Sequence, residues 1–307
     1  MAVSIEKIAF GGWPNCYRVS NGIIDLVATS DVGPRVVRLG FLGEKNEFAE
    51  FAEQSGVTGS DEWLIYGGHR LWHSPEAKPR TYWPDSKPIK VTEKANGLIL
   101  EQPTEPTTGI RKTIEVTMDP DEPRVVVLHR LVNEGLWDVE LAIWALSVMA
   151  PGGVAVSPVP TEEIDEEGLL PNRVLILWPY TDMADARWGW GRKYVMLRQD
   201  VNCEGPQKFG LSNSAGWGVY ANGGTCFVKY FELDEEVFPH GYPDGGASIE
   251  IYTNNRMLEL ETVGPITVLS PGCPMEHTEV WELRKGIPEI VSEADVDAYI
   301  LPIVAEG

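Results

Sequence analysis

The chain has 307 residues and carries 46 acidic residues against 25 basic ones, which gives a net charge of −21. This charge repels nucleic-acid phosphates and anionic lipid headgroups, so neither nucleic acid nor a membrane is an expected partner. No apolar run approaches the roughly 20 residues that cross a bilayer, residues 1–7 do not resemble a signal peptide, and the four cysteines are scattered, so we expect a cytoplasmic protein with reduced thiols.

Ten segments combine period-2 alternation with β-branched residues, and each is predicted to be a strand. In chain order they are residues 22–29, 35–41, 97–102, 110–118, 124–133, 139–149, 173–177, 225–231, 248–253 and 256–262. Turn signals join several of them, at residues 20–22 (SNG), 119–123 (DPDEP) and 222–224 (NGG). The acidic stretch 161–168 is expected to be an exposed loop. No shift of composition marks a boundary, so we predict a single all-β domain over residues 1–307.

Helix signals are few. Ser292 and Asp295 have the spacing of a capping box, which predicts a short helix that Pro302 ends. A second helix is predicted over residues 44–54. The economical architecture is therefore two large, packed antiparallel sheets with few short helices, whose long loops build a cleft.

The densest group of polar and aromatic residues lies at 66–76 (YGGHRLWHSPE) and 82–85 (YWPD). A Gly-Gly pair lets the backbone approach a ligand, histidine exchanges protons near neutral pH, arginine offers a planar fork of donors, and a tryptophan face stacks on a sugar ring. The alternative is a glycine turn followed by ordinary packing. We predict sugar contacts from six residues here: Arg70, Trp72, His73, Glu76, Tyr82 and Asp85.

The same segment contains a possible pair of metal ligands. His69 and His73 are four residues apart, which on a helix would place both rings on one face with Glu76 nearby, as zinc requires. The glycines and Pro75 argue against a helix, and the other histidines are scattered. We therefore predict no metal and no cofactor.

A second group of polar residues lies near the end of the chain. Strand alternation places Glu259 and Glu261 on one side of a strand, and His277, Glu279 and Trp281 on one side of the next. If these faces meet, carboxylates and an imidazole converge. The alternative is that they face solvent on an antiparallel sheet.

Tryptophans form a third feature. Trp137 and Trp144 flank an almost wholly apolar run, so we favour a core position for both over a role as sugar platforms. Residues 186–192 (ARWGWGR) differ, because glycines around two tryptophans indicate a loop. Trp188 is therefore predicted to contact sugar, although a lid packed on the sheets would have the same sequence.

With these segments identified, the chain resembles the galactose mutarotase-like superfamily of aldose 1-epimerase-like proteins, in particular members with a Gly-Gly-His-Arg-Leu-Trp segment. The matching pieces are residues 33–39, 67–72, 131–135, 261–264 and 269–272. The resemblance implies a supersandwich of large antiparallel sheets with a sugar-binding cleft. It also implies an isomerase that acts on a free or modified sugar, and it adds Arg35 and Glu279 to the expected substrate contacts.

In active members a histidine protonates the ring oxygen and a glutamate takes the proton of the anomeric hydroxyl, without a cofactor. By position, the resemblance implies Glu261 as the base and His69 with Arg70 as the pair that holds the substrate. For the acid we take His69 first and His277 second, with His73 and Tyr66 as further candidates. The family's usual acid lies on the strand after the Asn-x-Gly turn, where this chain has Trp144 and no histidine. A non-catalytic sugar-binding protein and an oligosaccharide hydrolase or lyase therefore stay open as alternatives.

Overall fold

The computed structural model describes residues 2–306, and most of the regular structure is antiparallel strand. One sheet has ten strands in a continuous path and an eleventh, β20, that pairs with β10. In spatial order the path is β1 (Ser4–Phe10), β2 (Trp13–Ser20), β3 (Ile24–Thr29), β4 (Arg35–Phe41), β5 (Gly68–Ser74), β10 (Val139–Met149), β19 (Leu258–Val263), β18 (Ile249–Thr253), β15 (Gln207–Leu211) and β12 (Leu175–Leu177), with β20 at Thr267–Leu269.

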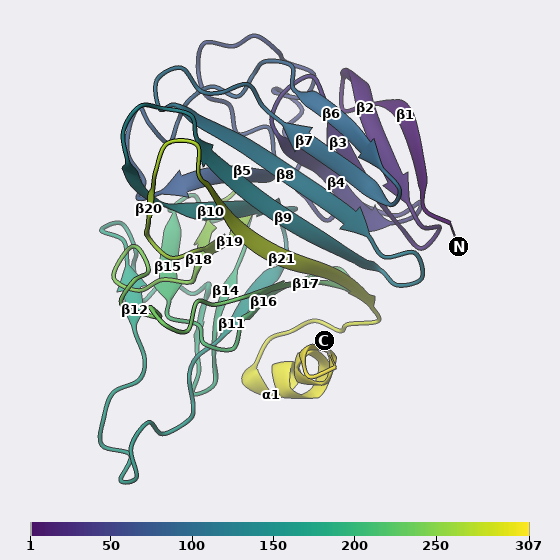
Figure 1. Cartoon of the computed structure of the whole chain (residues 1–307). Coiled ribbons are helices and arrows are strands. Elements are labelled where there is room, and N and C mark those ends of the chain that lie inside the picture. The colour runs from purple at the N-terminus through teal and green to yellow at the C-terminus, as the bar shows by residue number, and fades with distance from the viewer. Residues whose placement is uncertain (1, 307) are drawn as a thin grey trace.

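The second sheet has ten strands. Their spatial order is β13 (Trp188–Trp190), β14 (Tyr194–Arg198), β11 (Val154–Pro158), β16 (Trp217–Asn222), β17 (Thr225–Phe231), β21 (Pro274–Lys285), β9 (Arg124–Asn133), β8 (Ile110–Met118), β7 (Gly97–Glu101) and β6 (Lys90–Lys94). Figure 1 shows the two sheets together, with the long strands β8, β9 and β21 crossing the molecule. The all-β prediction is confirmed.

The main hydrophobic core lies between the two sheets. Alternate residues of β18 and β19, such as Ile251 and Leu260, meet alternate residues of β9 and β21, such as Val127 and Trp281. All four are fully buried. Because side chains alternate across a strand, the residues between them on β18 and β19 point to the other face of the eleven-stranded sheet. That outer face carries the site described below.

Strand prediction succeeded where the alternation was long. The predicted bounds of β4, β8, β9, β10 and β17 coincide with the observed ones, and the three predicted turns join β2 to β3, β8 to β9 and β16 to β17. Strand β5 was not predicted as a strand. Its residues are all buried, so it shows no alternation of apolar and polar positions.

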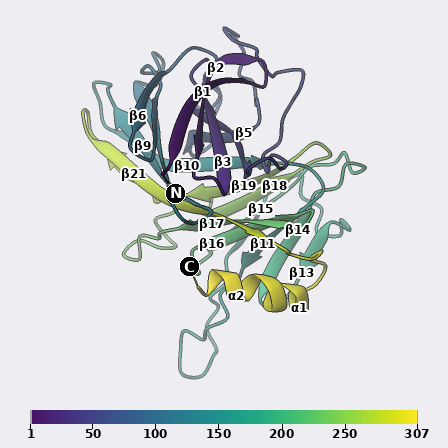
Figure 2. The same cartoon turned by 90° about the vertical axis from the view of Figure 1, so that its right-hand side faces the viewer.

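The C-terminal capping box is confirmed, since the Ser292 side chain accepts from the backbone of Asp295, whose carboxylate accepts in return from Ser292. The helical segment comprises α1 (Glu293–Asp295), a π-helical turn (Val296–Ile300) and α2 (Leu301–Val304), and Figure 2 shows it beside β13 and β14. Pro302 does not end the helix. It lies in the first turn of α2, where a missing N–H costs nothing.

The helix predicted over residues 44–54 is wrong. This segment forms turns and two isolated bridges, Phe48 with Met149 and Glu50 with Gly67. The Ala49 N–H donates to the Val148 carbonyl at 2.8 Å, so the backbone pairs with the end of β10 instead of with itself. Tertiary pairing overrides the local preference here.

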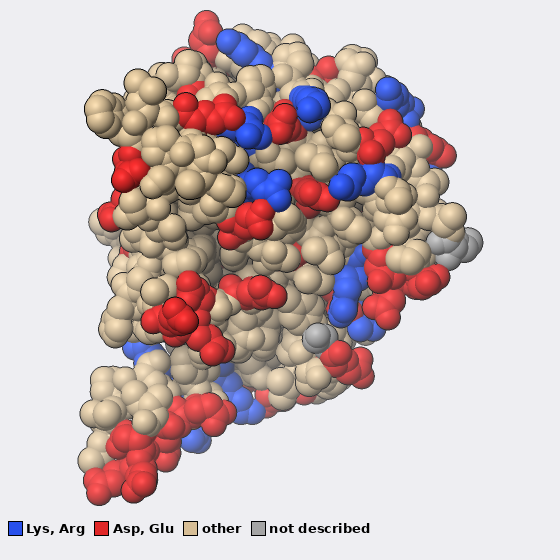
Figure 3. All heavy atoms as spheres, viewed as in Figure 1, with Lys and Arg blue, Asp and Glu red and all other residues tan. Residues whose placement is uncertain are grey.

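The acidic stretch 161–168 is an exposed loop between β11 and β12, as predicted. Acidic side chains gather on the protrusion at the lower left of Figure 3, which is the long connection at the same place in Figure 1. All four cysteines, each within residues 2–306, are free thiols. No helix in the described part of the chain is both long and apolar enough to cross a membrane.

Candidate functional site

A pocket of about 390 Å³ opens on the face of the eleven-stranded sheet that is turned away from the other sheet. Seven aromatic side chains form the largest group in its wall, and aliphatic side chains, two cations and two carboxylates complete it. The lining residues are Trp63, Ile65, Arg70, Trp72, Glu76, Tyr82, Trp144, Leu146, Trp178, Tyr180, Pro206, Lys208, Tyr252, Met257 and Glu259.

Five neighbouring strands build the floor by simple alternation. Strand β5 supplies Arg70 and Trp72, β10 supplies Trp144, β19 supplies Glu259, β18 supplies Tyr252 and β15 supplies Lys208. These strands are adjacent in the sheet, and the cross-strand pairs Trp72–Trp144 and Arg70–Leu146 fix the register between β5 and β10. Loops before and after these strands complete the walls.

The aromatic rings of one wall interlock. The ring centroids of Trp72 lie 5.1 Å from Trp63, 5.1 Å from Tyr82 and 5.3 Å from Trp144, all at steep interplanar angles. Edge-to-face packing of this kind holds each ring in place. The result is a rigid apolar wall of the kind that stacks on the C–H faces of a sugar.

Arg70 is the cation at one end of the floor. It pairs with Glu259 at 2.8 Å, and its guanidinium carbon lies 4.3 Å from the centroid of the Trp72 ring. Its Nε and Nη1 groups, and the Trp63 Nε1 group, are buried without a hydrogen-bond partner among residues 2–306. Buried donors ordinarily have partners, so these atoms indicate that a ligand or solvent completes the site.

Lys208 is the cation at the other end. Its ammonium lies 2.7 Å from Glu250 and 3.1 Å from Glu261, over the rings of Trp144 and Trp178. Burial by itself lowers the pKa of Lys208, but the two carboxylates outweigh it and raise that pKa. Burial raises the pKa of Glu250 to about 8 in spite of Lys208.

Glu261, the expected base, is fully buried below the pocket beside Lys208. It accepts a hydrogen bond from Trp144 Nε1 at 2.8 Å, so a tryptophan stands where the usual acid histidine was expected. Its Oε1 atom has no partner among the described residues. Burial raises the pKa of Glu261, although Lys208 opposes this, so the carboxyl is a stronger base than an exposed glutamate.

His69 and His73 lie on the opposite face of the eleven-stranded sheet from the pocket. Strand β5 alternates, so His69 and His73 point into the core between the sheets while Arg70 and Trp72 point into the pocket. His69 Nε2 lies 2.7 Å from His129 Nε2, and His69 Nδ1 lies 2.9 Å from Ser147 Oγ. The expected pairing of His69 with Glu261 is therefore not formed, and His73, fully buried, is not a wall of the pocket.

His277 and Glu279 also lie between the sheets. His277 Nε2 is 2.8 Å from Thr262 Oγ1, which faces the opposite side of β19 from Glu261. Glu279 accepts from Trp281 Nε1 at 2.7 Å and pairs with Lys229 at 2.9 Å. Neither residue lines the pocket, so the expected roles of His277 as acid and Glu279 as substrate contact do not fit the structure.

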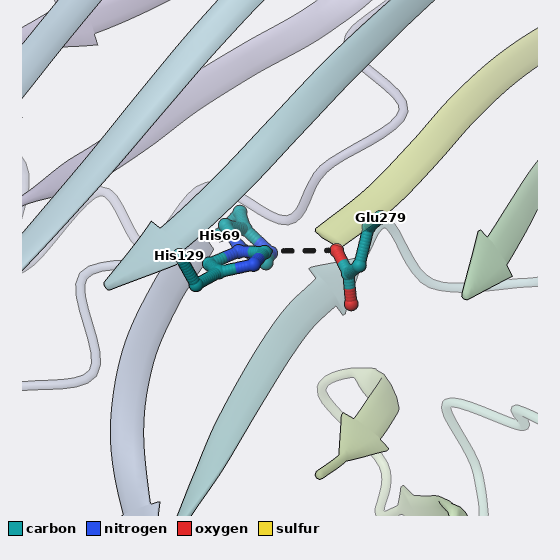
Figure 4. A group of neighbouring side chains, drawn as sticks. All are labelled: His69, His129 and Glu279. Carbon is teal, nitrogen blue, oxygen red and sulfur yellow. Dashed lines mark hydrogen bonds and ion pairs between the residues drawn. The ribbon is translucent and has the colours of Figure 1, made fainter. Parts of the chain in front are cut away.

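Three of these inner residues, His69, His129 and Glu279, meet between the sheets (Figure 4), where His129 Nε2 lies 4.0 Å from Glu279 Oε2. His129 Nδ1 donates to the His277 carbonyl at 3.0 Å, which leaves its Nε2 to accept from His69. Burial lowers the pKa of both His69 and His129, which favours this neutral arrangement. His69, His129 and Glu279 have ligand atoms within 4.8 Å of one another, but Lys229 already neutralises Glu279. The group therefore does not fit a metal ion.

Arg35 and Asp85 pair with each other at 2.8 Å and lie outside the pocket. Arg35 also donates to the carbonyl of Ile65 at 2.7 Å and to that of Leu64 at 3.2 Å. It thus fixes the segment that carries Trp63 and Ile65 into the pocket. Both were expected to contact substrate, but the structure gives Arg35 a positioning role, and Tyr66 is buried beside it.

The loop predicted over residues 186–192 is wrong at Trp188–Trp190, which form β13 and pair with β14, and Trp188 lies outside the pocket. Its Nε1 group donates to the Asp182 carbonyl at 2.8 Å, and its ring stacks on Trp190 at 4.7 Å between centroids. Trp144 is buried as predicted, at 4% exposure, and its ring also lines the pocket floor. The core position predicted for Trp137 is wrong, because this residue lies in the loop between β9 and β10 and is 79% exposed. The apolar pattern of the sequence does not show which of Trp137, Trp144 and Trp188 is exposed and which lines the pocket.

Four of the expected sugar contacts line the pocket: Arg70, Trp72, Glu76 and Tyr82. Several other lining residues were not predicted from the sequence. Lys208 and Tyr252 lie on short strands, and alternation within β15 and β18 was the available signal. Trp63, Trp178 and Tyr180 lie outside the named strands and carried no periodic signal. Only the three-dimensional structure brings them to one place.

No protein-family model matches the sequence, and no curated protein matches it. Solved structures do match. A candidate mutarotase (YeaD) from Salmonella typhimurium has a TM-score of 0.57 at 12% identity, covering 92% of this chain and 94% of that one. A candidate aldose 1-epimerase from Klebsiella pneumoniae has a TM-score of 0.57 at 12% identity, and the match covers 99% of this chain and 87% of that one.

A galactose mutarotase-like protein from Lactobacillus casei has a TM-score of 0.54 at 10% identity, covering 92% of this chain and 100% of that one. At these identities the likeness concerns the fold alone. It spans nearly the whole chain in each case, and it agrees with the two large antiparallel sheets described above. The chain therefore has the galactose mutarotase-like fold.

Proposed function

We propose that this protein binds a sugar in the pocket on the outer face of the eleven-stranded sheet. One observation carries the proposal: the pocket combines an interlocked aromatic wall with buried polar atoms that lack partners among the described residues. Arg70 and Trp63 line the pocket and supply donors without partners among these residues, and Glu261 Oε1, directly below the pocket, is an acceptor without one. Sugars present apolar C–H faces and a ring of hydroxyl groups that both donate and accept, so they match both parts.

The charges of the pocket indicate which sugars fit. Each cation is already paired, Arg70 with Glu259 and Lys208 with Glu250 and Glu261. No cation of the described pocket is left unpaired for a phosphate or a carboxylate, and the two carboxylates that line the pocket are joined by Glu250 and Glu261 beside Lys208. An uncharged sugar is therefore favoured over a sugar phosphate or a uronic acid.

A second candidate function is exchange of the anomers of a free aldose, and the environment of Glu261 favours it. A buried carboxylate with a raised pKa and a free oxygen suits proton abstraction from an anomeric hydroxyl. The imidazole acid is not in this pocket. Arg70 can donate a hydrogen bond to a ring oxygen but does not release its proton, so we expect any exchange to be slower than a His–Glu pair would give.

Binding is tested by titrating the purified protein with a panel of aldoses, followed by tryptophan fluorescence and calorimetry. Tyr180 lines the pocket and is 44% exposed, so Tyr180→Ala can weaken binding without harming the core. Tyr299 is 45% exposed on the C-terminal helical segment, so Tyr299→Ala is the matched control. We expect only Tyr180→Ala to weaken binding, and absence of binding for every sugar contradicts the proposal.

Exchange is tested separately by proton exchange spectroscopy of the two anomers of each bound aldose. Glu261→Gln keeps the shape of the side chain and removes the base. Acceleration by the wild type that Glu261→Gln abolishes supports an epimerase. Binding without acceleration supports the sugar-binding protein instead.

A further inference from the structure

A second cavity, of about 560 Å³, adjoins the sugar pocket. The two cavities share Trp63 and Tyr82 in their walls. The second cavity also uses Trp83 and three charged residues, Asp61, Glu62 and Lys78, which the proposed function does not involve. Both volumes fall within the range of small-molecule sites, so each cavity can hold a ligand unit of its own.

We infer that this second cavity is a sugar subsite and that the ligand is an oligosaccharide of at least two units. This rests on the proposed function, since the first unit occupies the pocket already described. The next unit passes the edge formed by Trp63 and Tyr82 and lies against Trp83. The protein is then a receptor, or an enzyme, for a short glycan rather than for a single free sugar.

The shared edge is built to contact two units. The rings of Trp63 and Tyr82 stand at 88° to each other with their centroids 5.4 Å apart. Two perpendicular rings that line both cavities present apolar surface on both sides. The Tyr82 hydroxyl donates to Glu76, which fixes the orientation of that ring at the rim.

The polar side chains of the second cavity fit hydroxyl groups. Asp61, Glu62 and Lys78 are all exposed, and the Lys78 ammonium lies 5.2 Å from the centroid of the Tyr82 ring. Two carboxylates accept hydrogen bonds and one ammonium donates them, which is a mixed set suited to an uncharged polyol. An aromatic face rimmed by such groups is the composition of the first pocket as well, so one continuous ligand can use both.

Calorimetry with matched sugars tests the inference. Glucose is compared with maltose and cellobiose, and galactose with lactose and galactobiose, on the wild type and on Trp83→Ala. For at least one sugar that binds, we expect the disaccharide to bind about tenfold more tightly than its monosaccharide, the gain from one additional aromatic platform. Trp83→Ala should remove that gain and leave the monosaccharide affinity unchanged.

The control is Trp137→Ala, because Trp137 is 79% exposed and lines neither cavity, and it should change neither affinity. If monosaccharides bind but no disaccharide binds more tightly, the second subsite is refuted while the proposed function stands. If the gain survives in Trp83→Ala, the subsite lies elsewhere and the inference is overturned. If no sugar of either length binds, the proposed function itself fails.

Discussion

Two buried lysines, Lys208 of the eleven-stranded sheet and Lys229 of the ten-stranded sheet, lie on opposite sides of the eleven-stranded sheet and behave differently. Lys229 points between the sheets, where Glu279 is the one carboxylate paired with it. Its ammonium also donates hydrogen bonds to the carbonyls of Ala145 and Leu260. Burial lowers the pKa of Lys229 in spite of Glu279. Lys208 points to the pocket, where two carboxylates raise its pKa and two tryptophan rings lie beside it.

This difference distinguishes buried charged groups that only stabilise the fold from buried charged groups that can still contact a ligand. The inner network of Lys229 closes on itself through Glu279 and Trp281, so little is left for a ligand. The outer group of Lys208 leaves Glu261 Oε1 without a partner among residues 2–306, below the cavity that Lys208 lines. We conclude that the inner face joins the sheets and that the outer face is available for binding.

The largest expected effect comes from breaking the inner ion pair. Lys229→Met leaves the Glu279 carboxylate fully buried without its cation, which should cost about 3–5 kcal/mol of unfolding free energy. Urea denaturation followed by circular dichroism measures it. The double variant Lys229→Met/Glu279→Gln should recover much of the loss, and a loss below about 1 kcal/mol in the single variant contradicts a structural role.

The same substitution on the outer face sharpens the comparison. Lys208→Met leaves Glu250 and Glu261 without their cation, but their raised pKa values let them take up protons. The loss of unfolding free energy should therefore be smaller than in Lys229→Met. Sugar affinity should fall in Lys208→Met because the pocket floor changes. Equal stability losses for the two lysine variants would remove the distinction between the faces.

The next largest effect is acid lability of the inner face. Burial lowers the pKa of His277 from 6.5 to about 4, so protonation favours the unfolded chain. The stabilising contribution is complete above pH 6.5 and is lost as the pH falls toward 4, on the order of 3 kcal/mol for this residue. His277→Asn should flatten the stability profile over this range.

Stability of the wild type, of His277→Asn and of a control, His240→Gln at an exposed histidine, is measured from pH 7.5 to pH 4. The control profile should parallel that of the wild type. If His277→Asn also parallels the wild type, the histidine does not carry the acid sensitivity.

A smaller effect is expected from Arg35, the link between the fold and the pocket. Arg35→Lys keeps the charge but cannot donate to Asp85, Ile65 and Leu64 together, so about 1–3 kcal/mol of stability should be lost. Because the segment at 63–65 is then less well fixed, sugar affinity should also fall severalfold. An unchanged affinity in a folded Arg35→Lys protein would show that Arg35 does not position the pocket wall.

The smallest expected change is a gain. Both ring nitrogens of His73 are buried without a hydrogen-bond partner among the described residues, and burial lowers the pKa of His73 to about 2. His73→Leu removes two unsatisfied polar atoms, so it should raise the unfolding free energy at pH 7 by about 1 kcal/mol. Sugar affinity should not change, whereas weaker binding would place His73 in the site.

Much of the fold could be predicted from the sequence, because long segments such as Arg124–Asn133 and Val139–Met149 have the residue pattern of strands. The site was accessible only in part. The segment with Arg70 and Trp72 was identified from its composition, but its strand has no polar–apolar alternation, so the opposite orientation of His69 could not be inferred. Lys208 and Trp63 reach the pocket through sheet order and loop packing, which single-sequence patterns do not encode.

The central claim is that the sugar binds on the outer face of the sheet and not beside the histidines. The most direct test is the affinity of the best-binding sugar for Arg70→Met and for His69→Gln, two substitutions at adjacent residues of β5 that point to opposite faces. Circular dichroism first confirms that both variants are folded. We predict that Arg70→Met weakens binding by about tenfold or more while His69→Gln binds like the wild type; the reverse result would contradict the account.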